Sequence, residues 1–204
     1  MNLFGLLISF GFLIIAMTVH EFAHGYVAYR LGDNTAKYSG RLSLNPLVHI
    51  DPIGTVVLPL FLFIATRGQF VFGTAKPVPI NYWALRNPKR DILWIGLSGP
   101  AVNILFAVAA SIIWRILPGS AAVIFICKNL ILINVVLGIF NLIPIPPLDG
   151  SRVLMSLLPE PLASRYSAIE PYGFFIVMAL MATGMLDVII WPFINLLLRI
   201  LIPL

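Results

Sequence analysis

Two histidines and a glutamate stand together in an otherwise apolar stretch near the start of the chain. His20, Glu21 and His24 follow residues 3–17, which contain no charged side chain. Residues four apart project from one face of a helix, so His20 and His24 would lie one turn apart on the same side. Two imidazole nitrogens at that spacing can bind one Zn²⁺ at about 2.0–2.1 Å. Ionisable groups are costly in an apolar helix, which favours a functional role over an incidental polar face.

Glu21 projects about 100° away around the same helix, close enough to reach a water on the metal without being a ligand. This is the His-Glu-x-x-His arrangement of zinc metalloproteases, in which the glutamate acts as the general base. The five-residue pattern also arises by chance in soluble helices, where a polar His/Glu surface explains it.

A catalytic zinc site uses three protein ligands and leaves one position open, so a third ligand must come from elsewhere. Candidates are few, because the chain has three histidines and eight acidic residues in all. Asp149 stands out, since it follows a long apolar run in a proline-rich stretch before Gly150. Irregular backbone at membrane depth is tolerated where it lines a polar cavity. An Asp-Gly turn that caps the next helix is a common alternative, so Asp149 by itself leaves both interpretations open.

The composition places these residues in a membrane protein. Of 204 residues, 60% are hydrophobic and 10% charged, and a soluble domain of this size cannot bury so much apolar surface. The pI near 9.7 does not indicate nucleic acid as a partner, because the basic residues are scattered between apolar runs and fit topology signals better. The single cysteine, Cys127, excludes an intrachain disulfide and a cysteine-based metal site.

The apolar pattern predicts an all-α polytopic membrane protein, one domain over residues 1–204, with about five to six membrane-embedded helices. The first helix covers residues 3–31 and stops at Gly32. The later helices are expected in this order: residues 92–114, residues 121–143, a short helix after Gly150, and a helical hairpin over residues 172–201 that is parted by Gly184 and Asp187.

The region between the first helix and residues 92–114 is expected to be irregular. Residues 34–46 carry a β-like pattern around Gly40 and are interpreted as a small β-hairpin. Residues 52–66 are apolar, but they are short and interrupted by prolines, which favours a re-entrant or interfacial segment.

With these motifs in view, the chain resembles the site-2 proteases, zinc metalloproteases that cut substrates within the membrane. Their signatures are His-Glu-x-x-His in one transmembrane helix and an Asn…Pro-x-Asp-Gly segment that ends another. Here these look like HEFAH at residues 20–24 and NLIPIPPLDG at residues 141–150. GPAVN at residues 99–103 is similar to the small-residue-plus-asparagine motif of the helix between them. No segment is long or polar enough for the PDZ or CBS domain of many relatives, so the chain is similar to a compact prokaryotic branch.

The resemblance implies one Zn²⁺ bound by His20, His24 and Asp149, with Glu21 as the general base. The implied partners are the lipid bilayer and a transmembrane protein substrate, whereas the oligomeric state is not indicated. Further residues of the two later motifs would support the site or contact the substrate: Asn103, Asn141 and Pro147. Asn103 could instead hold helices together, and Asn141 could have a purely structural role.

A transmembrane substrate helix must unwind before its peptide bonds become accessible. Residues 37–45 and 70–80 could offer an edge for strand addition to the unwound substrate, or they could be ordinary interfacial loops. His49 could be a gate or a regulatory metal ligand with Asp51, or an interfacial histidine that is hydrogen-bonded to local backbone.

The shared metal also predicts the topology. If Asp149 meets His20 and His24, the ends of their helices face one side of the membrane, so residues 52–66 cannot cross alone. That layout leaves only Arg115 and Lys128, of the 13 lysines and arginines, on the opposite side. Because basic residues favour the cytoplasm, we expect a multi-pass cell-membrane protein whose active site opens toward the cytoplasm, with the N-terminus outside.

Two other classes of function fit parts of the sequence. A non-proteolytic membrane scaffold or chaperone of the same family could keep the zinc site, but it gives no reason to retain Glu21. A proton or metal transporter would spread polar residues along a path, whereas here they are concentrated in the motifs.

Overall fold

The computed structural model describes residues 3–65, 73–117 and 119–203, and every regular element within them is a helix. Three helices are long and apolar enough to cross a membrane, namely α1 (Leu3–Arg30), α4 (Pro88–Ile116) and α5 (Ala121–Asn141). A further crossing would combine α8 (Glu170–Ala182) with α9 (Met185–Leu201), an apolar pair bent by 79°. The all-helical class is thus confirmed. The described residues contain three to four candidate spans, and the expected count of five to six membrane-embedded helices is not confirmed.

The first helix ends where the sequence predicts. Gly32 has a φ of +116°, which favours glycine because a side chain is strained there. The next N–H, of Asp33, turns back and donates to the Ala28 carbonyl at 3.0 Å. The bond satisfies one of the carbonyls that a helix end leaves open. The predicted range, 3–31, therefore agrees with the observed helix to within one residue.

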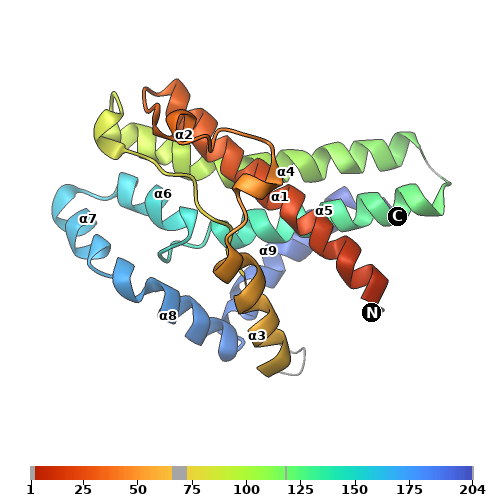
Figure 1. Cartoon of the computed structure of the whole chain (residues 1–204). Helices are drawn as coiled ribbons and strands as arrows, with labels where there is room; N and C mark the ends of the chain where they lie inside the picture. Colours follow the sequence, from red (N-terminus) through yellow and green to blue (C-terminus); the bar gives the residue numbers. More distant parts are fainter. Residues whose placement is uncertain (1–2, 66–72, 118, 204) are drawn as a thin grey trace.

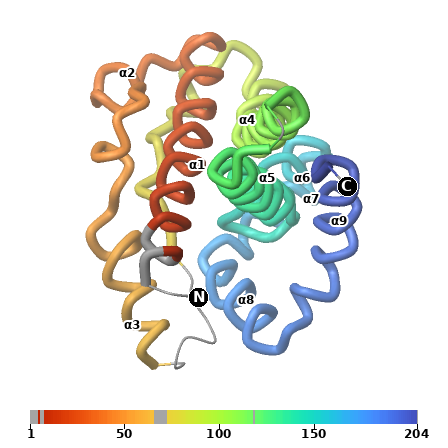
Figure 2. Tube along the Cα trace, turned by 90° about the vertical axis from the view of Figure 1, so that its right-hand side faces the viewer, coloured from red at the N-terminus to blue at the C-terminus, as the bar shows by residue number. Residues whose placement is uncertain are grey.

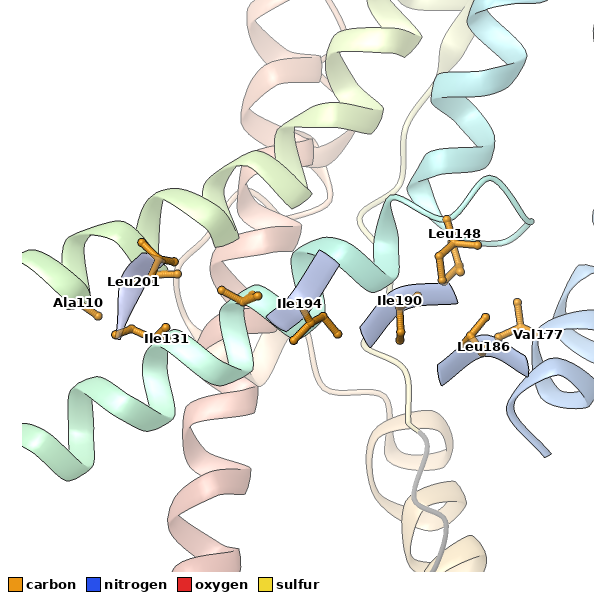
Figure 3. Packing of buried hydrophobic residues seen from close by; sticks show 11 residues of the cluster. Ala110, Ile131, Leu148, Val177, Leu186, Ile190, Ile194 and Leu201 are labelled. Carbon is orange, nitrogen blue, oxygen red and sulfur yellow. The ribbon is translucent and has the colours of Figure 1, made fainter. Parts of the chain in front are cut away.

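Helix α4 lies at the centre of the fold and contacts α1, α5 and α6 (Asp149–Leu157). Figures 1 and 2 show α4 and α5 side by side, with α1 across them. A Cβ at Gly138 of α5 would lie 3.3 Å from the Pro100 carbonyl, so the small residue allows the two backbones to approach. Figure 3 shows the apolar cluster between α5, α9 and the turn after α5, including Ile131, Leu148 and Ile194.

The β-hairpin predicted for residues 34–46 is wrong. The segment forms a short helical turn, α2 (Thr35–Tyr38), and leads into the 3-10 turn η1 (Pro46–Val48). Gly40, with a φ of +68°, ends the helical turn rather than a hairpin, and the Arg41 N–H bonds back to the Ala36 carbonyl at 2.8 Å. Since these polar backbone groups find partners locally, the segment needs no partner strand.

The apolar region after residue 51 is also helical. It comprises the π-helical turn η2 (Pro52–Val57) and α3 (Leu58–Ala65), which together are shorter than a membrane span. Residue 66 of the predicted re-entrant segment, like residues 70–72 of the predicted substrate edge, lies outside the described residues. Residues 73–81 have no regular secondary structure and lead to the turn η3 (Tyr82–Ala84) and the start of α4.

The C-terminal third follows the predicted order with one addition. Helix α6 begins at Asp149, slightly before the start predicted after Gly150, and α8 and α9 are parted at Gly184, which has a φ of +70°. The additional helix is α7 (Glu160–Ser167), which lies between α6 and α8.

Candidate metal centre and catalytic cavity

His20, His24 and Asp149 meet at one point where α1 faces the start of α6. The two Nε2 atoms lie 3.0 Å apart, and Asp149 Oδ2 lies 3.0 Å from that of His20 and 3.1 Å from that of His24. Both histidines are buried, with 5% and 6% of their surface exposed. Among the described residues this is the group of histidines and acids whose atoms lie close enough to share a metal ion.

The outer nitrogen of each imidazole is held by an acceptor. His24 Nδ1 donates to the Ile95 carbonyl at 2.7 Å, and His20 Nδ1 lies 2.6 Å from Asn103 Oδ1. The Asn103 amide nitrogen is already directed to Asn134 Oδ1 at 2.8 Å, so its oxygen is the group that accepts from His20. With Nδ1 protonated in both neutral rings, both Nε2 atoms keep their lone pairs and face inward.

The three converging atoms are therefore all acceptors, and they repel one another unless a cation lies among them. Asp149 begins α6 and directs Oδ2 at both Nε2 atoms. Two imidazole nitrogens and a carboxylate oxygen are the donor set of a catalytic zinc site with one open position.

Gly99 of α4 forms the third wall of this cluster. A Cβ built there would lie 2.6 Å from His20 Nε2 and in contact with His24 Nε2. An added methyl group would thus occupy the space between the two nitrogens, where a shared cation belongs. The backbone leaves a recess of about one atom, which fits a metal ion better than it fits a side chain.

Asp149 reaches the cluster because the chain turns sharply after α5. The turn contains a cis Pro146–Pro147 bond, and Gly150 is so close to the Leu142 carbonyl that any Cβ would collide with it. Gly96 of α4 allows the same close approach, since its Cβ would lie 3.2 Å from the Asp149 carbonyl. The small residues let α6 pack on α4 with its first residue directed at the histidines.

A cavity of about 380 Å³ adjoins the cluster, and Glu21 lines it together with both histidines and Asp149. Glu21 Oε2 accepts a hydrogen bond from the Val78 N–H at 2.9 Å. The carboxylate is thus held beside the cluster by the backbone of residues 73–81, without belonging to the group of ligand atoms.

Residues 73–81 bond to the rest of the chain along one edge. Residues 74, 76 and 78 use their N–H groups, and the alternating pattern is that of an extended strand with one edge occupied. The acceptors are the carbonyls of Gly54 for Thr74 (3.0 Å) and His49 for Lys76 (2.9 Å), and Glu21 for Val78.

The opposite edge of this segment carries the N–H and C=O of Ala75, which bond to no other group in the described parts of the chain. Ala75 is one of the residues that line the cavity. Positions 77 and 79, whose backbone nitrogens lie on the same edge as that of Ala75, are prolines and therefore carry no N–H. The exposed edge therefore offers a donor and an acceptor at Ala75 and no further donor at the next two alternate positions.

The supporting residues expected from the sequence have different surroundings. Asn103 of α4 bonds to His20 and to the Ala16 carbonyl on α1 and to Asn134 on α5, which fits the alternative that it holds helices together. Asn141 and Pro147 line the cavity, but the Asn141 amide donates to Leu137 of its own helix at 2.9 Å rather than to the Asp149 turn. His49 lies apart from the metal cluster and bonds through Nε2 to the Ser43 carbonyl at 2.8 Å, as expected for a histidine tied to local backbone.

Several residues around the site were not identified from the sequence. Asn134, which is 1% exposed, fixes Asn103, and Ser98 Oγ lies 3.2 Å from His24 Nδ1. An asparagine inside the otherwise apolar residues 130–140 is a usable signal for Asn134, because a polar group there needs a partner. Ser98 carries no comparable signal, since serine is common on packed membrane helices.

Comparisons with known proteins also indicate a zinc metalloprotease. The profile of Peptidase family M50 matches residues 112–183. "Putative zinc metalloprotease YwhC" of Bacillus subtilis is 35% identical over 192 residues, which cover 90% of this chain and 84% of the relative. "Putative zinc metalloprotease Rip2" of Mycolicibacterium smegmatis is 31% identical over 85% of this chain, and "Zinc metalloprotease MJ0392" of Methanocaldococcus jannaschii is 26% identical over 74%. The matches span 66% and 34% of those two relatives. No solved structure matches the chain.

Proposed function

Since the chain belongs to peptidase family M50, the site-2 protease family, and is accordingly a metalloprotease, we propose that it hydrolyses peptide bonds of transmembrane substrates. The observation that carries this proposal is the convergence of His20, His24 and Asp149, with Glu21 lining the adjoining cavity. The catalytic unit is a single domain over residues 1–204.

One Zn²⁺ would be held by His20 Nε2, His24 Nε2 and Asp149 Oδ2, and when bound it supplies a Lewis acid that polarises a carbonyl and acidifies water. Asn103 and the Ile95 carbonyl keep both imidazoles in the tautomer that directs a lone pair inward. Such partners of the ligands orient them and raise their basicity.

Glu21 moves the proton. Its carboxylate takes a proton from the attacking water as the water adds to the scissile carbonyl, and then delivers the proton to the leaving amine nitrogen. The Val78 N–H engages Oε2 and leaves Oε1 to act as the base. Glu21 is thus oriented before substrate arrives.

The unwound substrate would add as a strand to the edge of residues 73–81 that carries the Ala75 N–H and C=O. Ala75 would exchange two backbone hydrogen bonds with it, because both of its polar backbone groups are available there. Pro77 and Pro79 limit the pairing by providing no further N–H. Pairing is thereby confined to the part of the edge near Ala75.

In the membrane, we propose that the metal site opens toward the cytoplasm and that the N-terminus lies outside. This orientation leaves Arg115 and Lys128 on the outer side, in accord with the positive-inside rule. If α8 and α9 form one broken span, Arg199 joins them, and the excess of basic residues on the cytoplasmic side remains.

The experiment is zinc analysis together with cleavage of a reporter transmembrane segment by wild type and by Glu21→Gln. Wild type should bind one zinc per chain and cleave. Glu21→Gln should keep the zinc and lose about 10²–10⁴-fold in kcat, the usual contribution of a general base.

Glu160→Gln serves as the matched control, because Glu160 is an exposed acid on α7. A Glu21→Gln variant that cleaves as fast as wild type would contradict the role of Glu21. Wild type that binds no zinc would contradict the ligand assignment. A zinc-loaded wild type that is inert toward transmembrane segments but retains a binding partner would favour the scaffold function.

A further inference from the structure

Two buried charged side chains outside the catalytic cluster bond to the backbone of residues 73–81. They are Asp33, just after α1, and Arg41, just after α2. Neither forms an ion pair within 4.0 Å in the described parts of the chain, where the ion pairs join Asp149 to the two histidines. Burying a charge without an opposite charge is unfavourable unless hydrogen bonds compensate. The hydrogen bonds of these two residues are therefore the interactions that compensate for burying their charges.

Asp33 holds one end of the segment. It is fully buried, and its Oδ2 accepts the Asn81 N–H at 2.7 Å while Oδ1 accepts the Thr35 N–H at 2.9 Å. Both bonds are made to a charged acceptor, which makes them stronger than neutral ones. The carboxylate thereby joins the end of α1, the start of α2 and the end of the segment.

Arg41 holds the middle of the segment, at residues 76 and 77. Its Nη2 donates to the Lys76 carbonyl at 2.5 Å and to the Pro77 carbonyl at 3.3 Å, and 8% of its surface is exposed. Its Nε has no partner within the described residues. The guanidinium is thus directed mainly at the backbone of the segment.

Val78 lies between these two anchors. Its N–H donates to Glu21, and its side chain packs so closely on α1 that a Cβ at Gly25 would lie 3.0 Å from Val78 Cγ1. The distance of the segment from α1 is therefore set at Val78, whereas its course on either side depends on Asp33 and Arg41. That course determines where the Ala75 edge lies relative to the metal cluster.

We propose that Asp33 and Arg41 are positioning residues that hold residues 76–81 so that the Ala75 edge can receive the substrate. The inference rests on the proposed function, because it assigns the edge to substrate binding. Neither residue touches the reacting atoms. They act through the backbone of the segment, and their loss should impair substrate binding more than the chemical step.

The first test measures KM and kcat of zinc-loaded Asp33→Asn and Arg41→Gln in proteoliposomes with the reporter segment. Each variant should raise KM by about tenfold, the effect of losing a hydrogen bond to a charged group, while kcat changes less and zinc content stays at the wild-type value. Arg41→Lys, which can still donate to a carbonyl, should restore most of the wild-type KM. Asp187→Asn and Arg199→Gln are matched controls, because both residues are exposed on α9.

The second test is amide hydrogen exchange on the zinc-loaded wild type, which does not depend on a variant that folds. The N–H groups of residues 76, 78 and 81 should be protected, and that of Ala75 should exchange quickly until substrate is added. Equal exchange of all four would overturn the inference, as would folded Asp33→Asn and Arg41→Gln variants with the wild-type KM.

The outcome also separates this inference from the proposed function. A wild type that neither binds zinc nor cleaves would refute the proposed function itself. Cleavage by wild type that depends on Glu21, with KM unchanged in both folded variants, would refute only the positioning role. A fall in kcat at constant KM would likewise count against it, because that result indicates a general structural defect.

Discussion

The metal cluster and residues 73–81 border the same cavity, but they are held in different ways. The cluster is enclosed by helices: its three side chains come from α1 and from the start of the short α6, and α4 covers them through Gly99 and Asn103. The segment has no regular secondary structure and is fastened along one edge by alternate backbone groups. Hydrolysis needs ligands that do not move, whereas binding of an unwound substrate needs one available edge. The helices around the cluster provide the first, and residues 73–81, which are bonded along one edge only, provide the second.

The difference implies that substitutions in the cluster should affect zinc, whereas substitutions in the segment should affect substrate. The largest effect is expected at Gly99. A methyl group there would occupy the space between the two Nε2 atoms, so Gly99→Ala should lower both zinc affinity and cleavage by a factor of about 100 or more.

Metal analysis and the cleavage assay check this prediction. Gly11→Ala, in the same membrane environment on α1, is the control, because a Cβ there meets nothing within 4 Å. If Gly99→Ala binds zinc as wild type does, the recess at Gly99 is not the metal site.

A smaller effect is expected at Asn103, which bonds to His20 and is not one of the proposed zinc ligands. Asn103→Ala removes the acceptor of His20 Nδ1 and should weaken zinc binding by about 10–100-fold, as is usual for the partners of metal ligands. A zinc competition titration with a chelator measures the change.

Asn129→Ala is the matched control for Asn103, since the Asn129 amide donates to its own helix and not to a ligand. An Asn103→Ala variant with normal zinc affinity and a raised KM would instead restore the substrate-contact interpretation of Asn103.

The smallest effect is expected in the segment. Ala75→Pro removes the available N–H, leaves the inward bonds of residues 74, 76 and 78 in place, and should raise KM by about 3–10-fold, the effect of one backbone hydrogen bond. Zinc content should not change. Steady-state kinetics with the reporter segment provide the measurement, and Ala75→Ser, which keeps the N–H, should behave as wild type. A KM unaffected by Ala75→Pro would argue against strand addition at this edge.

The ranges predicted for α1 and α5 agree with the structure to within about two residues, because long apolar runs and a glycine stop are local signals. The range predicted for α4, 92–114, starts four residues late, because the helix begins in the polar residues 88–91 before the apolar run. The β-hairpin predicted for residues 34–46 was wrong for the opposite reason. Their polar-apolar alternation is short, and Asp33, Gly40 and Arg41 complete a helical turn that the alternation does not reveal.

The site was predictable where the identity of a residue alone indicates its chemistry. His20, His24, Glu21 and Asp149 are the residues a zinc hydrolase requires, and the structure brings all four to one cavity. Asn134 and Ser98 escaped notice, as did the roles of Asp33 and Arg41. These residues act through hydrogen bonds to groups far away in the sequence. Neither their residue type nor their spacing predicts which group is the hydrogen-bond partner.

The sequence by itself determined the membrane class, the long helices and the pairing of His20 with His24, because a helix repeats every 3.6 residues and fixes neighbours one turn apart. Only the tertiary structure decided how Asp149, 125 residues after His24, reaches the same point. It also decided which backbone groups of residues 73–81 remain available beside the cavity. Such placements depend on how closely α4, α5 and α6 pack, and that depends on side-chain volumes at many contacts at once.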